Sequence, residues 1–518
     1  MPSFGDRVDA LKHLMGEVIA LRHAADLIEW DERVCMPIGG AEVHGDMQAT
    51  LRRLAHEKFT SDEIGGAIED LQRDVHDADP DSDVYRLVTV TARDYEKATR
   101  VPPSFVAEHA LAISAAQHAW IQARAESAFP IFQPHLQRIV ELKKQYVTFF
   151  PGAEHPYDVL VDEFEPGMTT REIKAIFDVL RPRQVALLRA IARRPQVADD
   201  CLRTRYAEAD LLAFAVEVVT AFGFDWTRGR QDKSVHPFAT AIGGDDVRIT
   251  TRFVEAHPMS LLFGTMHETG HALYEQGVSA AHRSTLLEGG TSLGLHESQS
   301  RLWENLIGRS RPFWEHFFPV LRERFPAQLR DVGLEQFYKA VNRVAPSPIR
   351  VEADETTYNL HVMLRVDLEI GLIDGSIPVA DVPALWNARM QEYLGITPAN
   401  DAAGVLQDVH WSAGLIGYFG TYTLGNLIAA QIWDTFTRRH PSFDDDMRRG
   451  NFAPLLAWLR TELHAHGRKY EPQELVERTT GSRVDPEPYL RYLEKKYAEV
   501  YGMEGEGESW KSEVGTYK

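Results

Sequence analysis

The sequence predicts a mainly α-helical protein with one small β-sheet. Apolar residues recur at helical spacing over long stretches near both ends of the chain, and segments with strand-like alternation are few. A chain of 518 residues with 44% hydrophobic residues can bury a large core. We find no internal repeat and no long low-complexity linker. These observations favour a mainly helical protein, and the length alone would suggest several domains.

The first predicted helix lies near the amino terminus, and a short strand is predicted at 247–254. The helical period is kept by Leu11, Leu14, Val18, Leu21, Ala25 and Ile28. In the strand, Val247, Ile249, Thr251 and Phe253 alternate with Arg248, Thr250 and Arg252. Beside a cleft, the edge of this strand could pair with an extended peptide and bind many sequences. The alternative is an ordinary hairpin strand covered by helices.

The segment from Pro258 to Gln276 predicts a buried helix that carries a metal-binding motif. Its apolar positions are Leu261, Leu262, Met266 and Leu273, and Gly277 follows where a C-terminal cap would be. Within it stands His267-Glu268-Thr269-Gly270-His271. Residues four apart share a helix face, so both imidazoles can bind one ion while Glu268 projects beside it. Zinc lowers the pKa of a bound water to about 7, and Glu268 could accept its proton. Alternatively, both histidines satisfy polar neighbours.

Catalytic zinc usually takes three protein ligands, so a third candidate is needed. Glu275 lies on the same helix roughly 12 Å beyond His267 and cannot complete the site. Glu297 is the better candidate, because it opens a second helical pattern after the glycine-rich break at 289–290. That pattern continues through Leu302, Trp303, Leu306 and Ile307. Glu288 and Glu304 are alternatives that would otherwise lie on solvated helix faces.

Two further segments carry candidate functional side chains. His236 precedes Pro237 and is expected on an extended segment, where it would line a cleft. The segment from Gly404 to Asn426 contains His410, Tyr418 and Tyr422 among several glycines, and such side chains can donate hydrogen bonds to a developing oxyanion. The alternative for a tyrosine there is a core position with a satisfied hydroxyl. A late helix follows, marked by Leu455, Leu456, Leu459 and Leu463.

Six motifs in order resemble the carboxypeptidase Taq family of zinc metallocarboxypeptidases. They are HPF at 236–238, DVRIT at 246–250, HETGH at 267–271, HESQS at 296–300, IRVEAD at 349–354 and GVLQDVHW at 404–411. The likeness extends from Glu29-Trp30-Asp31 to Tyr489-Leu490-Arg491-Tyr492. It implies a large helical metallopeptidase fold with a deep cleft and a small sheet near the active site. By this resemblance, His267, His271 and Glu297 bind the metal and Glu268 is the general base.

The resemblance also implies which peptide bond is cut. In this family the arginine that corresponds to Arg350 is associated with the free C-terminal carboxylate of the substrate, which a guanidinium fork suits. The enzyme would then be a carboxypeptidase, and the family suggests that it disfavours C-terminal proline. Broad specificity is the expectation from the strand edge at 247–254. The alternative is that Arg350 pairs with Asp354 or Glu352, as neighbouring charges often do.

The same likeness places His410, Tyr418 and Tyr422 near the cleft. Tyr422 is the first candidate for oxyanion stabilisation and His410 the second. The chain departs from the family at Gly420, where proline commonly follows Tyr-Phe. A freer backbone at Gly420 would hold Tyr422 less firmly.

The likeness favours one continuous catalytic unit with a soft division. Residues 1–230 would form an amino-terminal helical region that walls or covers the cleft, and 231–503 the zinc-binding catalytic region. Residues 504–518 are polar and glycine-rich, so a disordered tail is expected.

Composition limits the partners and the location. A net charge of −20 argues against nucleic-acid binding, which needs a basic surface. Cys35 and Cys201 have no metal spacing and are expected to be reduced. Neither a signal peptide nor a membrane span is evident, so we expect a cytoplasmic enzyme acting on peptides. Homodimerisation is implied only by the family.

Two other functions stay open from the sequence. One is a zinc oligoendopeptidase, which would not need Arg350 and would cut amidated peptides. The other is a peptide-binding protein that keeps the motifs without turnover, against which the intact Glu268 argues. The metal is also open, since affinity arguments allow Co²⁺ or Mn²⁺ beside Zn²⁺.

Overall fold

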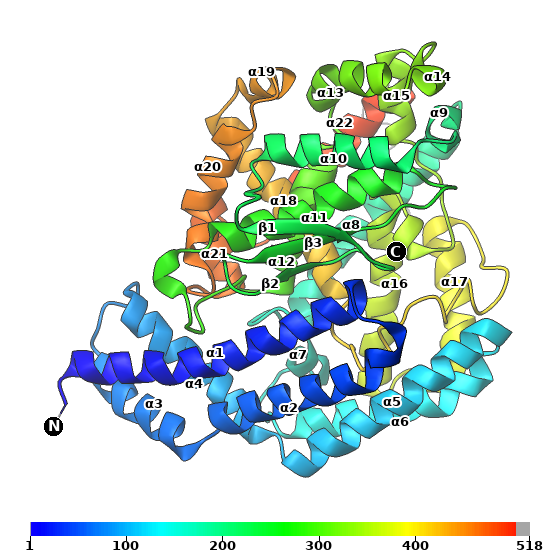
Figure 1. Cartoon of the computed structure of the whole chain (residues 1–518). Coiled ribbons are helices and arrows are strands. Elements are labelled where there is room, and N and C mark those ends of the chain that lie inside the picture. Colours follow the sequence, from blue (N-terminus) through cyan, green and yellow to red (C-terminus); the bar gives the residue numbers. More distant parts are fainter. Residues whose placement is uncertain (1, 504–518) are drawn as a thin grey trace. The chain divides into compact units, whose positions relative to one another are not determined.

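A computed structural model of the chain describes residues 2–503. Helices dominate this part, and the strands in it form one three-stranded sheet, so the predicted mainly α class is confirmed (Figure 1). The chain divides into two compact units that alternate along the sequence. Of the described residues, unit 1 comprises 2–100, Asp200–Leu334 and Ile432–Gly481, and unit 2 comprises Val101–Asp199, Glu335–Gln431 and 482–503.

Unit 1 begins with a group of long helices. Its helices are α1 (Phe4–Val34), η1 (Ile38–Gly40), α2 (Ala41–Phe59), α3 (Asp62–Val75), α4 (Asp83–Arg100), α9 (Asp200–Arg203), α10 (Glu208–Phe222), α11 (Met259–Gly277), η2 (Ala280–His282), α12 (Leu293–Arg301), η3 (Leu302–Ile307), α13 (Arg311–Arg324), α14 (Pro326–Leu329), α19 (Phe443–Arg448), α20 (Ala453–Glu462), η6 (His464–His466) and α21 (Pro472–Thr480). The predicted early helix is α1, which begins at a capping box of Ser3 and Asp6. Its apolar stripe, with Leu11 and Val18 buried, packs against α3 and α4.

The sheet lies in unit 1 between α1 and α11. Its strands are β1 (Gly229–Lys233), β2 (Ala239–Ala241) and β3 (Val247–Thr251), in the order β1-β3-β2. Strand β3 runs parallel to β1 and antiparallel to β2, with Ile249 paired to Gln231 on one side and Ala239 on the other. Val247 and Ile249 are buried, and β3 packs on α11.

The predicted free edge of the strand at 247–254 is therefore wrong. Strand β3 is the central strand, so its main-chain groups already bond to β1 and β2 and cannot accept a peptide. The hairpin alternative is correct for the pair β2 and β3. The central position of β3 could not be predicted from the sequence, because β1 and β2 lack the alternation of apolar residues that marked β3.

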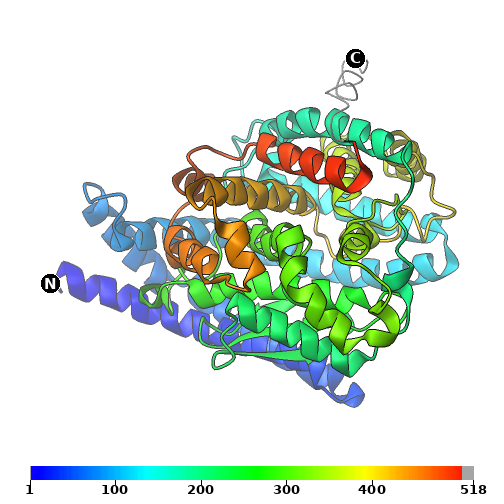
Figure 2. The same ribbon diagram turned by 90° about the horizontal axis from the view of Figure 1, so that it is seen from above.

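Unit 2 is built around a buried helix. Its helices are α5 (Pro103–Glu126), α6 (Phe129–Thr148), α7 (Pro156–Val161), α8 (Thr170–Ala192), η4 (Arg350–Glu352), α16 (Glu355–Asp374), η5 (Val379–Asp381), α17 (Val382–Leu394) and α22 (Glu487–Tyr501). Helix α16 packs against α6, α7, α8 and α17, and Asp354 caps its first turn. Helix α22, red in Figure 2, lies alongside α8. Helices α15 (Leu334–Val341) and α18 (Gly420–Arg439) each contain a boundary between the units.

Four further expectations concern the division of the chain, its tail, its cysteines and membrane crossing. The division near residue 230 stays a prediction, and the predicted tail at 504–518 lies outside the described residues. Cys35 is exposed, Cys201 is buried, and neither forms a disulfide. Among the described helices, none combines the length and the apolar character that a membrane crossing needs.

Candidate functional site

Helix α11 carries the HETGH motif and matches the predicted helix to within two residues at each end. Its buried positions include Leu261, Leu262, Met266 and Leu273, as the apolar period predicted. The prediction that Gly277 caps this helix is wrong, because Gly277 is its last residue and Val278 follows as the cap. A glycine is needed there for packing, since a Cβ would lie 2.6 Å from Cβ of His464.

The predicted second helix crosses α11 at Gly270. A Cβ on this residue would lie 2.4 Å from the carbonyl oxygen of Gln299 and 2.5 Å from Cα of Ser300, both backbone atoms of α12. The missing side chain lets α12 approach closely and present the carboxylate of Glu297 to the histidines.

His267, His271 and Glu297 are brought together, as predicted. One ligand atom from each lies within 4.8 Å of the others. Oε2 of Glu297 is 3.6 Å from Nε2 of His267 and 3.5 Å from Nε2 of His271. The set of two imidazole nitrogens and one carboxylate oxygen fits a divalent transition metal that keeps one position open. Three converging lone pairs without any cation between them would repel one another, so the donor set suits a metal.

A second layer of ionic contacts surrounds two of these candidate ligands, Glu297 and His267. Nε of Arg301 donates to Oε1 of Glu297 at 2.7 Å, which leaves Oε2 toward the histidines. Nδ1 of His267 lies 2.9 Å from Oε2 of Glu304. Arg301 also donates to Oε2 of Glu304, and Arg309 donates to its Oε1. These contacts lower the pKa of Glu304 to about 2 against the opposing effect of burial.

The expected solvated position of Glu304 is therefore wrong. Glu304 lies in the π-helical turn η3, and its side chain is only 13% exposed. The π turn directly follows α12 and turns Glu304 toward His267, a change of helical period that the sequence did not signal. The expected alternative ligand Glu288 instead accepts hydrogen bonds from the backbone N–H of Gly244 and Ser284.

The remaining candidate ligand, His271, contacts His296, which in turn contacts Glu275. Nδ1 of His271 lies 2.7 Å from Nδ1 of His296, and Nε2 of His296 lies 2.7 Å from Oε1 of Glu275. From the sequence, Glu275 was expected not to bind the metal, and the contact of Glu275 with His296 was not predicted. The available signal was its position four residues after His271, on the same helix face.

Glu268 lies in the same cluster and is buried. Burial raises its pKa to about 7, and the nearby carboxylates Glu297 and Glu304 act in the same direction while His267 opposes them. A carboxyl group in such surroundings is well matched to proton transfer near neutral pH.

His236 is not part of this cluster in the structure. It lies in the exposed loop between β1 and β2, where its carbonyl oxygen accepts a hydrogen bond from Oγ of Ser234. Its expected role as cleft lining stays a prediction.

In unit 2, Arg350 is buried and pairs with a residue that the sequence did not suggest. Its Nε and Nη2 donate to Oδ1 of Asp408 at 3.1 and 2.9 Å, and its Nη1 donates to the hydroxyl of Tyr358 at 2.9 Å. The alternative pairing with Asp354 is wrong, because Asp354 caps α16 and accepts from backbone N–H groups. Asp408 belongs to the motif at 404–411, so the two motifs meet in space.

Asp408 is shared with a second arginine. Nε of the fully buried Arg365 donates to Oδ2 of Asp408 at 2.7 Å. The two guanidinium groups hold the pKa of Asp408 well below its usual range despite burial. Burial also lowers the pKa of His410 to about 4, so this histidine is neutral near pH 7. The group of Arg350, Arg365 and Asp408 thus carries one positive charge in excess, which suits an anionic ligand.

The predicted aromatic residues of unit 2 gather beside Arg350. Nε2 of His410 lies 3.2 Å from the hydroxyl of Tyr422, and the rings of Tyr418 and Tyr422 are 5.4 Å apart. Cζ of Arg350 is 4.9 Å from the ring centre of Tyr422. Tyr422 is therefore held by side-chain contacts, although Gly420 opens α18 without a proline.

Glu369 of α16 anchors the segment that carries these residues. It accepts hydrogen bonds from Nε1 of Trp411 at 2.8 Å, the N–H of Gly417 at 3.0 Å and the hydroxyl of Tyr157 at 2.6 Å. Burial raises the pKa of Glu369 to about 7. Such a carboxylate fixes the path of the chain between His410 and Tyr418.

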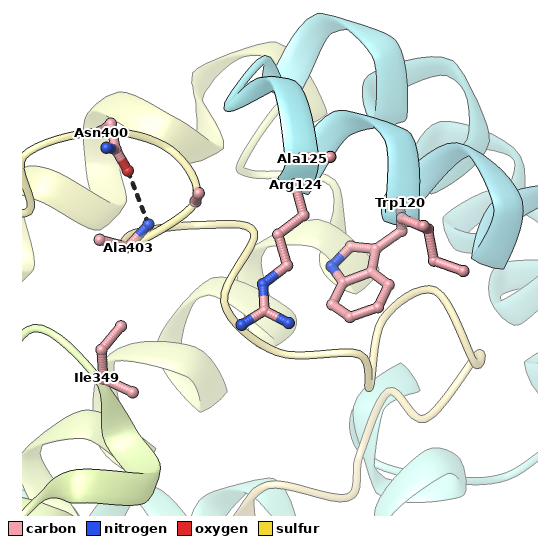
Figure 3. Close-up of a pocket in the computed structure, with 8 residues that line it drawn as sticks. Trp120, Arg124, Ala125, Ile349, Asn400 and Ala403 are labelled. Atoms are coloured by element: carbon pink, nitrogen blue, oxygen red, sulfur yellow. Dashed lines mark hydrogen bonds between the residues drawn. The ribbon is translucent and has the colours of Figure 1, made fainter. Parts of the chain in front are cut away.

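A pocket of about 590 Å³ in unit 2 lies beside Ile349, the residue before Arg350. Trp120 and Arg124 project into it from α5, and the loop from Asn400 to Ala403 lies on another side, as Figure 3 shows. Its only charged lining residue is the exposed Arg124. No sequence feature predicted this pocket.

Known proteins resemble this chain over nearly its whole length. The family described as carboxypeptidase Taq (M32) metallopeptidase matches residues 10–497. Thermostable carboxypeptidase 1 of Thermus thermophilus is 42% identical over 498 residues, which are 94% of this chain and 97% of that protein. Carboxypeptidase 1 of Bacillus subtilis is 36% identical, with 96% and 98% covered.

Solved structures are also similar to this chain over nearly its whole length. The crystal structure of M32 carboxypeptidase from Deinococcus radiodurans R1 is similar with a TM-score of 0.93 and 40% identity, over 96% of this chain and 99% of that chain. Pyrococcus furiosus carboxypeptidase, in a structure titled Apo-Mg, is similar with a TM-score of 0.92 and 35% identity, over 96% and 99%.

Proposed function

This chain belongs to the carboxypeptidase Taq (M32) family and is a metallocarboxypeptidase, and from that premise we propose that it is a zinc enzyme of broad specificity. It would hydrolyse the last peptide bond of peptides with a free C-terminus and disfavour C-terminal proline. The observation that carries the proposal is the convergence of His267, His271 and Glu297 beside the buried Glu268.

His267, His271 and Glu297 would hold the metal. When bound, a divalent ion supplies Lewis-acid polarisation of a carbonyl and lowers the pKa of water. Two imidazoles and a carboxylate are the donor set of many catalytic zinc sites, which supports Zn²⁺. The same donors accept Co²⁺ and Mn²⁺, so these ions are possible substitutes.

Glu268 would act as the general base. Its carboxylate would accept a proton from the attacking water and pass it to the nitrogen of the leaving residue. The raised pKa supports this role, because a base with a pKa near the working pH also serves as the acid that returns the proton.

Arg350 would bind the C-terminal carboxylate of the substrate. The excess positive charge that it shares with Arg365 and Asp408 supports this role, since an anion would balance that charge. Tyr422, or secondly His410, would donate a hydrogen bond to the oxyanion that forms at the scissile carbonyl. Tyr418 would contact the substrate beside them, and His236 would line the cleft.

The remaining expectations from the sequence are proposals of the same kind. They are a cytoplasmic location, a homodimer, and an amino-terminal region at 1–230 that walls or covers the cleft. The family resemblance supports the homodimer and the arrangement of the cleft. A size measurement in solution tests the oligomeric state.

The proposal is tested with two N-blocked peptides of one sequence, one with a free C-terminus and one amidated. Mass spectrometry should find stepwise loss of single residues from the free-acid peptide alone. Arg350→Ala should lower kcat/KM for that peptide by roughly 100-fold or more, because a charge-assisted hydrogen bond to the terminal carboxylate is lost. Arg389→Ala is a matched control, since Arg389 forms an ion pair with Asp367 elsewhere in unit 2.

Two results would contradict the proposal. Internal cleavage of both peptides would establish the oligoendopeptidase alternative, which shares the metal motif and needs no carboxylate-binding arginine. No cleavage of either peptide by the metal-loaded protein would favour the binding protein.

A further inference from the structure

His271 differs from the other metal-ligating histidine in its outer contact. Nδ1 of His267 meets the carboxylate of Glu304 directly, at 2.9 Å. Nδ1 of His271 instead meets another imidazole, that of His296, and the carboxylate of Glu275 lies one residue further. The three side chains in this series of contacts are largely buried, with 17%, 22% and 14% exposure for His271, His296 and Glu275.

The order of these contacts determines where each proton lies. Nε2 of His271 faces Glu297, so it must carry a lone pair when a metal is bound, and the proton of the neutral ring is then on Nδ1. That N–H can donate only if Nδ1 of His296 is an acceptor. The proton of His296 is then on Nε2, where it donates to Oε1 of Glu275. The carboxylate of Glu275 can only accept a hydrogen bond, so it favours this one arrangement of protons.

The packing around His296 keeps its ring in this position. The ring contacts Tyr274 with centroids 5.2 Å apart and His271 with centroids 4.8 Å apart. A Cβ on Gly290 would lie 2.7 Å from Cδ2 of His296, so the absence of a side chain at Gly290 makes room for the ring. The contact between the two imidazoles is therefore built into the fold.

We propose that Glu275 and His296 are positioning residues that hold His271 in the tautomer whose Nε2 can bind the metal. The inference rests on the proposed metal site and adds two residues to it. His296 acts as an acceptor for His271, and Glu275 fixes the tautomer of His296. Outer partners of this kind contribute about 10- to 100-fold to metal affinity.

The test measures metal affinity directly by competition of the apoprotein with a chelating dye for Zn²⁺. Glu275→Ala and His296→Phe should each weaken binding by about 10- to 100-fold, because the tautomer of His271 is no longer fixed. Glu275→Gln keeps an acceptor oxygen, so it should recover most of the affinity. The thermal unfolding midpoint of each apoprotein is measured in parallel, and an unchanged midpoint separates positioning from a loss of fold.

Glu288→Ala is the matched control. Glu288 is a partly buried acid of the same unit, and it accepts hydrogen bonds from the backbone N–H groups of Gly244 and Ser284. It should bind Zn²⁺ as the wild type does. Wild-type affinity in both Glu275→Ala and His296→Phe would overturn the inference, and so would equal weakening in Glu275→Gln and Glu275→Ala. Glu297→Ala separates a failure of the proposed metal site from a failure of the positioning role. If this variant also kept wild-type Zn²⁺ affinity, the proposed metal site would be wrong, and the inference would be wrong with it.

Discussion

At the scale of single residues, three glutamates of one cluster differ in protonation because their partners differ. Burial opposes ionisation of Glu297 and Glu304, but Arg301 and the contacts with the histidines lower the pKa of both groups. Burial, together with these two carboxylates, raises the pKa of Glu268 to about 7. Identical side chains would thus serve as ligand, outer partner and proton acceptor in the proposed site, according to their surroundings.

Glu268→Gln should keep the metal and lose catalysis. The amide cannot accept a proton from water, so kcat should fall by roughly 10²- to 10⁴-fold. Metal content measured by elemental analysis should stay at the wild-type level, because Glu268 is not one of the three ligands. Normal turnover by this variant would remove Glu268 from the role of base.

Glu369 should make stability depend on pH. Burial raises its pKa from about 4.5 to about 7, so the folded state holds the proton more tightly than the unfolded state. Its contribution to stability therefore falls as pH rises between these values and is constant above them. The unfolding midpoint of the wild type relative to Glu369→Gln should be higher at pH 5 than at pH 8, measured by circular dichroism with chelator present. A difference that is equal at both pH values, or larger at pH 8, would contradict this prediction.

At the scale of elements, the metal site depends on how closely α11 and α12 cross. Each helix alone presents part of the donor set, with two histidines on α11 and Glu297 on α12. Gly270 allows the backbones to meet, and the π turn η3 then directs Glu304 to His267. The motif HETGH therefore contains both candidate ligands of α11 and the glycine at which α12 makes its close contact.

Gly270→Ala should weaken the site through this contact. The new methyl would overlap backbone atoms of α12, so α12 must move, at a cost of about 1–3 kcal/mol. Zn²⁺ affinity should fall with the unfolding midpoint. Gly264→Ala is the control on the same helix, where a Cβ meets nothing within 4 Å, and helix propensity predicts a slight stabilisation. Equal behaviour of the two variants would refute the role of the crossing.

At the scale of the whole molecule, the chain passes back and forth between two compact units. Unit 1 gathers the metal donors and the sheet, and unit 2 gathers Arg350, Asp408 and the aromatic residues of the 404–426 segment. Each unit is assembled from three stretches of sequence, so each depends on contacts between distant parts of the chain. Metal binding adds stability only to the folded arrangement of α11 and α12.

Removal of the metal should lower the unfolding temperature. A ligand that binds only the folded state stabilises it by about 4 kcal/mol when its free concentration is 1,000 times Kd. Calorimetry with Zn²⁺ and with excess chelator should record this shift in the wild type. Glu297→Ala should show almost none, and a full shift in that variant would place the metal elsewhere.

The sequence by itself determined the fold class and the family. It also predicted His267, His271 and Glu297 as metal ligands, and the choice of Glu297 came from the family resemblance. The fold class and the HETGH spacing are local features, because helical period and motif spacing act over a few residues of the chain. The tertiary structure decided that Arg350 pairs with Asp408, that Glu304 contacts His267 and His296 contacts His271, and that β3 is a central strand. Each of these outcomes depends on which distant segments meet, and burial then selects partners that no spacing along the chain encodes.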